Sequence, residues 1–384
     1  MNPQQPPLSL YIHLPWCVRK CPYCDFNSHK AGPGTPRDRY IAALRKDLHS
    51  TAPFAADREI VSIFLGGGTP SLFSPAQIEE ILQQANQTFT LAEDCEITME
   101  ANPGTVERGN LAAYRHGGVN RLSLGAQSFD AKMLQALGRI HGPEEIQIAY
   151  DEATSAGFNS INIDLMFALP GQDRRQAAAD VEKMLQLSPQ HVSYYQLTLE
   201  PNTIFHSRPP ANMPTDDASW EIQTSCHALL EQAGYEQYEI SAFAKPGYRC
   251  RHNLNYWSFG DYLAAGAGAH GKHTDMHGDI WRYQRPANPL AYMEAIENGA
   301  TDAGLTKLKS ADVGFEFMLN ALRMTAGFSE SALISRTGLS IEDFSQPIEG
   351  ARIDGLIERT ANGVWRPTVT GFRFLNELQA RFLP

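Results

Sequence analysis

The hydrophobic and polar positions of the first 200 residues switch repeatedly between two periods. Short runs rich in β-forming residues are each followed by a stretch with helical spacing, and several stretches begin next to Pro or end in Gly. Strand–helix alternation is typical of βαβ units around a parallel sheet, so the pattern predicts an α/β fold with a full or partial (β/α)6 barrel; the alternative is an open doubly wound sheet. The six runs span residues 8–14, 60–66, 95–101, 121–127, 160–169 and 191–199.

Polar side chains share one face of three of these runs, because side chains alternate between the two faces of a strand. Several of them lie near the carboxyl end of a run, where barrels build their active sites. They either satisfy loop backbone groups or line a site. The pairs are Thr98 and Glu100, Ser123 and Gln127, and Asn162 and Asp164.

The pattern changes after about residue 240. Residues 263–271 are rich in Gly and Ala and predict a close-packed turn, and two amphipathic helices follow. The last 60 residues read as helix, helix, a hairpin with an Asn362–Gly363 turn, and helix, which is typical of a small winged-helix-like α+β module. We therefore predict a barrel core at 1–240, a connecting segment at 241–305 and a C-terminal module at 306–384.

Composition and charge exclude several classes of protein. The net charge of −11 argues against a surface that binds nucleic acid or an anionic membrane, so we expect the C-terminal module to have a structural or docking role. The N-terminus has neither the basic nor the apolar region of a secretory signal, and no apolar run approaches the roughly 18 residues of a membrane span. We expect a cytoplasmic protein.

Half of the six cysteines lie in one short loop, PWCVRKCPYCDF, with the spacing C-x₃-C-x₂-C. In the cytoplasm such a cluster indicates a metal or redox site rather than disulfides. Zinc would need a fourth ligand, such as His13 or His29. An iron–sulfur cluster held by Cys17, Cys21 and Cys24 would keep one iron open for binding or catalysis. Cys95, Cys226 and Cys250 are scattered and read as small buried hydrophobes.

This loop, placed after a first strand and ahead of repeated βα units, resembles the radical SAM superfamily. In that family three cysteines hold a [4Fe–4S] cluster and S-adenosylmethionine (SAM) chelates the fourth iron. Further segments, in the same order, are similar to the oxygen-independent coproporphyrinogen III oxidase group. They are YIHLPWC, GGGTPS, MEANPGT, LGAQSF, LGRIH and IDLMFALPGQ.

The resemblance implies a set of site residues. Cys17, Cys21 and Cys24 would hold the cluster, and Gly67, Gly68 and Thr69 would let backbone approach the methionine end of SAM. Glu100 would accept hydrogen bonds from SAM. The remaining implied SAM contacts are Tyr11, Tyr23, Gln127, Arg139 and Asp164.

Two features separate the chain from the true oxidases. Those enzymes carry a further Cys two residues after the third, where this chain has Phe26, and a phenyl ring cannot transfer protons or electrons as a thiol can. The segment RHNLNYW resembles the H-N-x-x-Y-W signature of the HemW branch, whose members are regarded as haem chaperones. In this interpretation His252 is a candidate haem ligand, and Tyr256 and Trp257 would pack against the macrocycle. His270, His273 and His277 are a second candidate metal group, although a polar loop is the favoured interpretation.

The leading hypothesis is a haem chaperone that binds haem and passes it to an acceptor, such as a respiratory enzyme. The expected cofactors are a [4Fe–4S] cluster, SAM and haem, and a homodimer sharing one haem is compatible with this function. Whether SAM is cleaved stays open. The alternatives are an oxygen-independent coproporphyrinogen III oxidase, which Phe26 disfavours, and a zinc-stapled docking scaffold.

Overall fold

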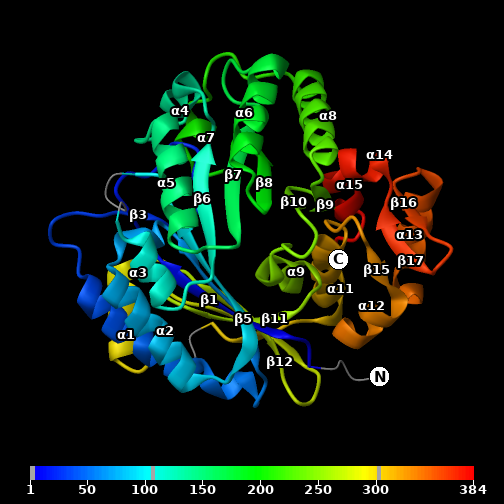
Figure 1. The fold of residues 1–384 in the computed structure, drawn as a ribbon. Coiled ribbons are helices and arrows are strands. Elements are labelled where there is room, and N and C mark those ends of the chain that lie inside the picture. Colours follow the sequence, from blue (N-terminus) through cyan, green and yellow to red (C-terminus); the bar gives the residue numbers. More distant parts are fainter. Residues whose placement is uncertain (1–4, 105–108, 301–303) are drawn as a thin grey trace.

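The computed structural model describes residues 5–104, 109–300 and 304–384. Its main element within these ranges is a 12-stranded sheet with the order β14-β13-β12-β11-β1-β4-β5-β6-β7-β8-β10-β9 (Figure 1). The six predicted runs form six strands that neighbour one another in parallel in chain order. The sheet is open rather than closed into a full barrel, and the predicted α/β fold of six successive parallel strands is confirmed. The six strands are β1 (Leu8–Leu14), β4 (Ile60–Gly67), β5 (Leu91–Ala101), β6 (Arg121–Gln127), β7 (Ile161–Phe167) and β8 (His191–Gln196).

Amphipathic helices connect these strands and pack on the sheet (Figure 1). In α2 (Pro75–Thr88), Ser74 and Gln77 form a reciprocal capping box, and the buried face carries Ile78, Ile81 and Leu82 at helical spacing. The other connecting helices are α1 (Arg37–Thr51), α3 (Leu111–His116), α4 (Ala131–Ala136), α5 (Pro143–Ser155) and α6 (Arg174–Leu187). Two further helices, α7 (Ile204–Ser207) and α8 (Asp216–Gln232), follow β8.

Both edges of the parallel sheet are extended by strands from beyond residue 235. β11 (Asp261–Ala265) pairs in parallel with β1, and an antiparallel ribbon of β12 (His270–Thr274), β13 (Ile280–Gln284) and β14 (Thr306–Lys307) continues from it. At the other edge β10 (Ala242–Ala244) and β9 (Glu236–Glu239) are antiparallel. The predicted close-packed turn lies at residues 266–269, where Gly266 has a φ of +107° and a Cβ atom would lie 2.4 Å from the His13 carbonyl oxygen, but the residues on either side of it form β11 and β12. The prediction of a polar loop around His273 was wrong, because His273 pairs with Trp281 of β13.

The C-terminal residues form a smaller module around a second apolar core, in orange and red in Figure 1. Its three-stranded sheet has the order β15-β17-β16, and Gly363 takes a φ of 79° in the predicted hairpin turn. We propose that this module begins at α11, although Phe259 and Ile280 of the preceding segment share its core. Its elements are α11 (Ser310–Ala321), β15 (Phe328–Ser329), α12 (Glu330–Thr337), α13 (Ser345–Ile353), β16 (Ile357–Arg359), β17 (Val364–Pro367), α14 (Val369–Arg373) and α15 (Leu375–Ala380).

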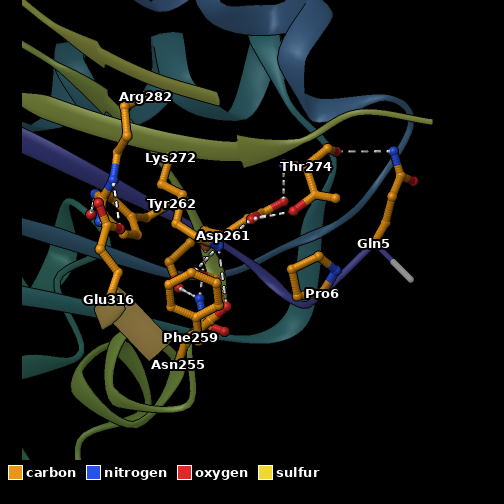
Figure 2. Close-up of polar contacts among 12 residues, drawn as sticks. Gln5, Pro6, Asn255, Phe259, Asp261, Tyr262, Lys272, Thr274, Arg282 and Glu316 are labelled. Atoms are coloured by element: carbon orange, nitrogen blue, oxygen red, sulfur yellow. Dashed lines mark hydrogen bonds and ion pairs between the residues drawn. The ribbon is translucent and has the colours of Figure 1, made fainter. Parts of the chain in front are cut away.

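A buried ionic cluster centred on Asp261 joins the N-terminal segment, the antiparallel ribbon and α9 (Arg251–Trp257) (Figure 2). The carboxylate accepts hydrogen bonds from Lys272 Nζ at 2.8 Å and from Arg58 Nη1 at 2.6 Å. The other two donors of the ammonium group reach the carbonyls of Phe259 and Gly260, so each of its protons has a partner. Nearby, the ion pair of Arg282 with Glu316 ties the ribbon to α11.

Candidate functional site

The cysteine loop is closed by two short parallel strands, β2 (Trp16–Cys17) and β3 (His29–Lys30). Within it, Cys24 N donates to the carbonyl of Cys21 at 3.2 Å, which forms a tight turn around Pro22. The backbone N–H groups of Gly68 and Thr69 donate to the carbonyls of Leu14 and Trp16, both at 2.8 Å. The loop is thereby fixed to the carboxyl ends of β1 and β4.

The glycines after β4 are needed for contacts within the protein itself. A Cβ atom on Gly67 would lie 2.4 Å from the His13 ring, and the φ of Gly67 is +112°. A Cβ atom on Gly68 would lie 2.7 Å from the Trp16 backbone. These contacts explain why both positions are glycine: the GGGTP turn packs so closely on β1 and the cysteine loop that a side chain would not fit.

Each of the three thiols has a hydrogen-bonding neighbour. Thr69 Oγ1 lies 3.5 Å from Cys17 Sγ, Arg139 Nη1 lies 3.7 Å from Cys21 Sγ, and Ser28 Oγ lies 3.9 Å from Cys24 Sγ. Burial raises the pKa of the Cys17 and Cys24 thiols. A bound metal offsets this cost, because metal ligation favours the thiolate.

The arrangement of ligands suits an iron–sulfur cluster better than a single zinc ion. Within the described residues, no group of three or more His, Cys, Asp or Glu side chains is close enough to share one metal ion. Both ring nitrogens of His13 are engaged, one with Tyr11 Oη at 3.0 Å and the other with the Asn27 carbonyl at 2.8 Å. In a cubane cluster each cysteine binds a different iron, so the three sulfurs do not need to converge on one point.

A cavity of about 350 Å³ lies between this loop and the carboxyl ends of the parallel strands. It is lined by the inward-facing polar residues that alternation predicts, except Thr98, which is fully buried and does not line it. Eleven of the predicted cluster and SAM residues line it, and Tyr11 does not. The eleven are Cys17, Cys21, Cys24, Tyr23, Gly67, Gly68, Thr69, Glu100, Gln127, Arg139 and Asp164.

Two carboxyl groups form the acidic part of the cavity. Glu100 accepts a hydrogen bond from the Gly67 N–H at 3.1 Å, and burial, with the charge of Asp164, raises the pKa of Glu100 to about 8. Asp164 accepts hydrogen bonds from Asn162 at 2.8 Å and Ser123 at 3.2 Å. A neutral Glu100 can both donate and accept hydrogen bonds, which suits amine and hydroxyl groups of a ligand.

Tyr11 and Tyr23 occupy different positions. The Tyr23 ring lines the cavity and packs near Phe205, with 6.4 Å between ring centroids. Tyr11 does not line the cavity. Its ring stacks on Phe64, which does, and its hydroxyl is hydrogen-bonded to His13. Tyr11 therefore supports the residues that border the cavity.

The three haem candidates lie on α9, which packs against β1, β4 and β11 (Figure 1). His252 is 8% exposed, and its Nδ1 atom is hydrogen-bonded to Ser62 Oγ at 3.1 Å. Burial, followed by the charge of Arg121, lowers the pKa of His252 to about 3. Tyr256 and Trp257 contact each other edge to face, with centroids 4.9 Å apart.

None of the three haem candidates lines the cavity, whereas their neighbour Asn253 does. Within the described residues, His270, His273 and His277 do not form a group of three side chains that could hold one metal ion. There, His273 stacks on Phe54 at 4.3 Å between centroids.

Several cavity residues were missed from sequence. Tyr195 and Ser193 alternate on β8 in phase with the residues of β7, so strand periodicity contained the signal for both. Asn102 follows Glu100 in the MEANPGT motif. Arg121 alternates on β6 in phase with Ser123 and Gln127, and Asn253 belongs to the RHNLNYW motif, so the sequence contained a signal for both.

Residues 11–184 match the model of the radical SAM superfamily. The chain is 46% identical over 378 residues to a protein of Escherichia coli strain K12 named heme chaperone HemW, covering 98% of both. This chain belongs to the HemW family. Other members include the heme chaperones HemW of Haemophilus influenzae, 45% identical over 99% of both chains, and of Bacillus subtilis, 32% identical over 98% of this chain and 99% of that one.

A solved structure has the same fold. The coproporphyrinogen III oxidase HemN from Escherichia coli, described as a radical SAM enzyme, superposes with a TM-score of 0.81 over 98% of this chain and 90% of that chain, at 24% identity. This member of the HemW family therefore has the same fold as that oxidase. No helix in the described parts of the chain has the length and apolar character required to cross a bilayer.

Proposed function

We propose that this chain binds haem and delivers it to an acceptor haem protein. The observation that carries the proposal is its 46% identity, over nearly the whole length of both chains, to a protein named heme chaperone HemW. Phe26 supports it further, since this side chain is 59% exposed at the edge of the cavity, where the true oxidases would present a thiol.

We propose that Cys17, Cys21 and Cys24 hold a [4Fe–4S] cluster with one iron left to SAM. Such a cluster, when bound and reduced, supplies an electron for SAM cleavage. Three hydrogen-bonded thiols at the edge of one cavity support this assignment. The ligands must stay reduced, so the proposal includes a cytoplasmic location.

The SAM assignment rests on the polar lining of the cavity. We propose that Glu100, in its neutral form, exchanges hydrogen bonds with amine or hydroxyl groups of SAM, and that Asp164 attracts positive charge. Tyr11 would act indirectly, by holding Phe64 and His13 in place. The other proposed contacts are Tyr23, Gly67, Gly68, Thr69, Gln127 and Arg139.

The haem assignment rests on α9. We propose that α9 contributes His252, Tyr256 and Trp257 to haem binding. His252 can coordinate iron only after it leaves its buried position beside Ser62, so this proposal requires α9 to shift on haem binding. An acceptor such as a respiratory enzyme, and a homodimer sharing one haem, belong to the same proposal.

A second candidate function is oxidation of coproporphyrinogen III, which the fold similarity to HemN favours. One anaerobic experiment separates the two candidates. Cluster-reconstituted protein is titrated with haem and, in parallel, incubated with coproporphyrinogen III, SAM and a reductant. The chaperone function predicts a Soret band and no protoporphyrinogen. Product formation without a haem spectrum would reject the chaperone proposal in favour of the oxidase.

A further inference from the structure

Side chains from three sequence motifs form one continuous series of hydrogen bonds next to the cysteine loop. Asn102 of MEANPGT lies between Thr69 of GGGTP and Arg139 of LGRIH. Asn102 Nδ2 donates to Thr69 Oγ1 at 3.0 Å, and Asn102 Oδ1 accepts from Arg139 Nη2 at 2.5 Å. One amide side chain therefore holds a hydroxyl group and a guanidinium group at the same time.

The outer ends of this chain are two of the three cysteines. The Thr69 hydroxyl accepts from Asn102, which leaves its single proton for Cys17 Sγ at 3.5 Å. The Arg139 guanidinium is fixed through Nη2 to Asn102 and to the Gly125 carbonyl at 2.8 Å, and this orientation directs Nη1 to Cys21 Sγ at 3.7 Å. The Cys24 sulfur lies 3.9 Å from Ser28 Oγ and takes no part in this chain.

The surrounding backbone leaves space for this arrangement. A Cβ atom on Gly125 would lie 3.2 Å from Asn102 Oδ1 and 3.3 Å from Arg139 Nη2. Thr69 is 4% exposed, so its hydroxyl is largely screened from water that would compete for its proton. The geometry of the three side chains is therefore set by packing.

We propose that Asn102 is a positioning residue that aims hydrogen bonds from Thr69 and Arg139 at the Cys17 and Cys21 ligands of the cluster. Hydrogen bonds and positive charge at cysteine sulfurs stabilise the reduced, more negative state of an iron–sulfur cluster and so raise its reduction potential. Asn102 thereby sets the ease of reduction of the cluster without touching it. This inference rests on the cluster proposed above.

The test is a redox titration of the reconstituted cluster, followed by electron paramagnetic resonance in the absence of SAM, so that SAM contacts do not contribute. Asn102→Leu removes both bonds of the amide. The expected result is a more negative midpoint potential and an altered spectrum of the reduced cluster. The matched control is Asn120→Leu, because the Asn120 amide also bridges two groups, Ile97 N at 2.7 Å and Cys95 O at 2.8 Å, away from the cysteine loop.

A second pair of variants keeps the test decisive if Asn102→Leu fails to fold or to load. Thr69→Val removes the donor to Cys17 and is expected to lower the potential, whereas Thr69→Ser keeps the hydroxyl and is expected to restore it. Unchanged potentials in Asn102→Leu and Thr69→Val, or an equal shift in Asn120→Leu, would overturn the inference. Wild-type protein without iron and acid-labile sulfide would instead reject the cluster itself.

Discussion

Ser62 Oγ and His252 Nδ1 lie 3.1 Å apart, and this hydrogen bond joins β4 to α9 in the interior. Ser62 also meets Ser9 Oγ at 2.8 Å, and Asn255 Nδ2 donates to the same Ser9 hydroxyl at 2.9 Å. Two residues of α9, His252 and Asn255, are thus bonded through a serine pair to the two strands that lead to the cysteine loop. The motif RHNLNYW thereby holds this helix against β1, β4 and β11.

His252→Ala tests both roles of this histidine. We expect the variant to lose about 1–3 kcal/mol of unfolding free energy, because it removes a buried hydrogen-bonding partner and leaves a void. If His252 also binds iron, the Soret band on haem titration weakens while the cluster absorbance is kept.

His227→Ala is the control, since His227 is a largely enclosed histidine packed on Phe243 outside α9. Urea unfolding and haem titration of both variants make the comparison. An unchanged haem affinity in His252→Ala would remove this residue from the haem site. Ser62→Ala frees the imidazole, so it is expected to bind haem at least as tightly as the wild type.

Replacing Asp261 by Asn is expected to destabilise the fold by about 3–5 kcal/mol, since Lys272 and Arg58 lose their buried counter-charge. Burial alone would raise the pKa of Asp261, but Lys272 and Arg58 hold it below its usual range. An acid with a lowered folded-state pKa stabilises the protein above its unfolded pKa of about 4.

This contribution is lost as the pH falls through the folded-state pKa. Unfolding free energies of wild type and Asp261→Asn, measured between about pH 3 and 7, are therefore expected to differ most near neutrality and to converge in acid. A difference that stays constant with pH would show that the ionised carboxylate is not the stabilising species.

Glu100→Gln is expected to change the pH dependence of stability in the opposite direction to Asp261→Asn. The folded-state pKa of Glu100 is raised to about 8 from 4.5, so ionisation opposes folding and stability falls as the pH rises between these values. We expect the ligand-free variant to be more stable than wild type at alkaline pH, by on the order of 5 kcal/mol, and equally stable in acid.

The same variant is expected to bind SAM less tightly, which equilibrium dialysis on cluster-loaded protein measures. Lower stability of Glu100→Gln at alkaline pH would contradict the assigned cost of burying this carboxylate. Unaltered SAM affinity would remove Glu100 from the proposed binding site.

Cys21→Ala is expected to abolish retention of the roughly four irons of a cubane cluster after anaerobic reconstitution, because two thiolates remain. Iron and sulfide analysis provides the measurement, with Cys226→Ala as the control, since Cys226 is buried in α8 away from the loop. Equal iron content in the two variants would show that the loop does not hold the cluster.

The periodicity of the sequence was sufficient for the central strands and their connecting helices. β1 and β6 begin and end as predicted, and helices follow the strands as predicted, because alternation and capping are local properties. β5 begins at Leu91, earlier than residue 95, and the strands β11 and β12 confine the predicted turn to residues 266–269 and replace the predicted loop around His273. These errors lie where pairing with distant strands overrides local composition.

By itself the sequence determined the parallel α/β core, the grouping of three thiols in one loop and the acidic residues near strand ends. Cysteine spacing along the chain identifies the loop, and alternation along each strand identifies the face that carries the acidic residues. Only the tertiary structure decided that His252 faces Ser62 while Asn253 faces the cavity, and that Asn102 joins Thr69 to Arg139. Such relationships join residues tens to hundreds of positions apart, and their geometry follows from the packing of whole elements.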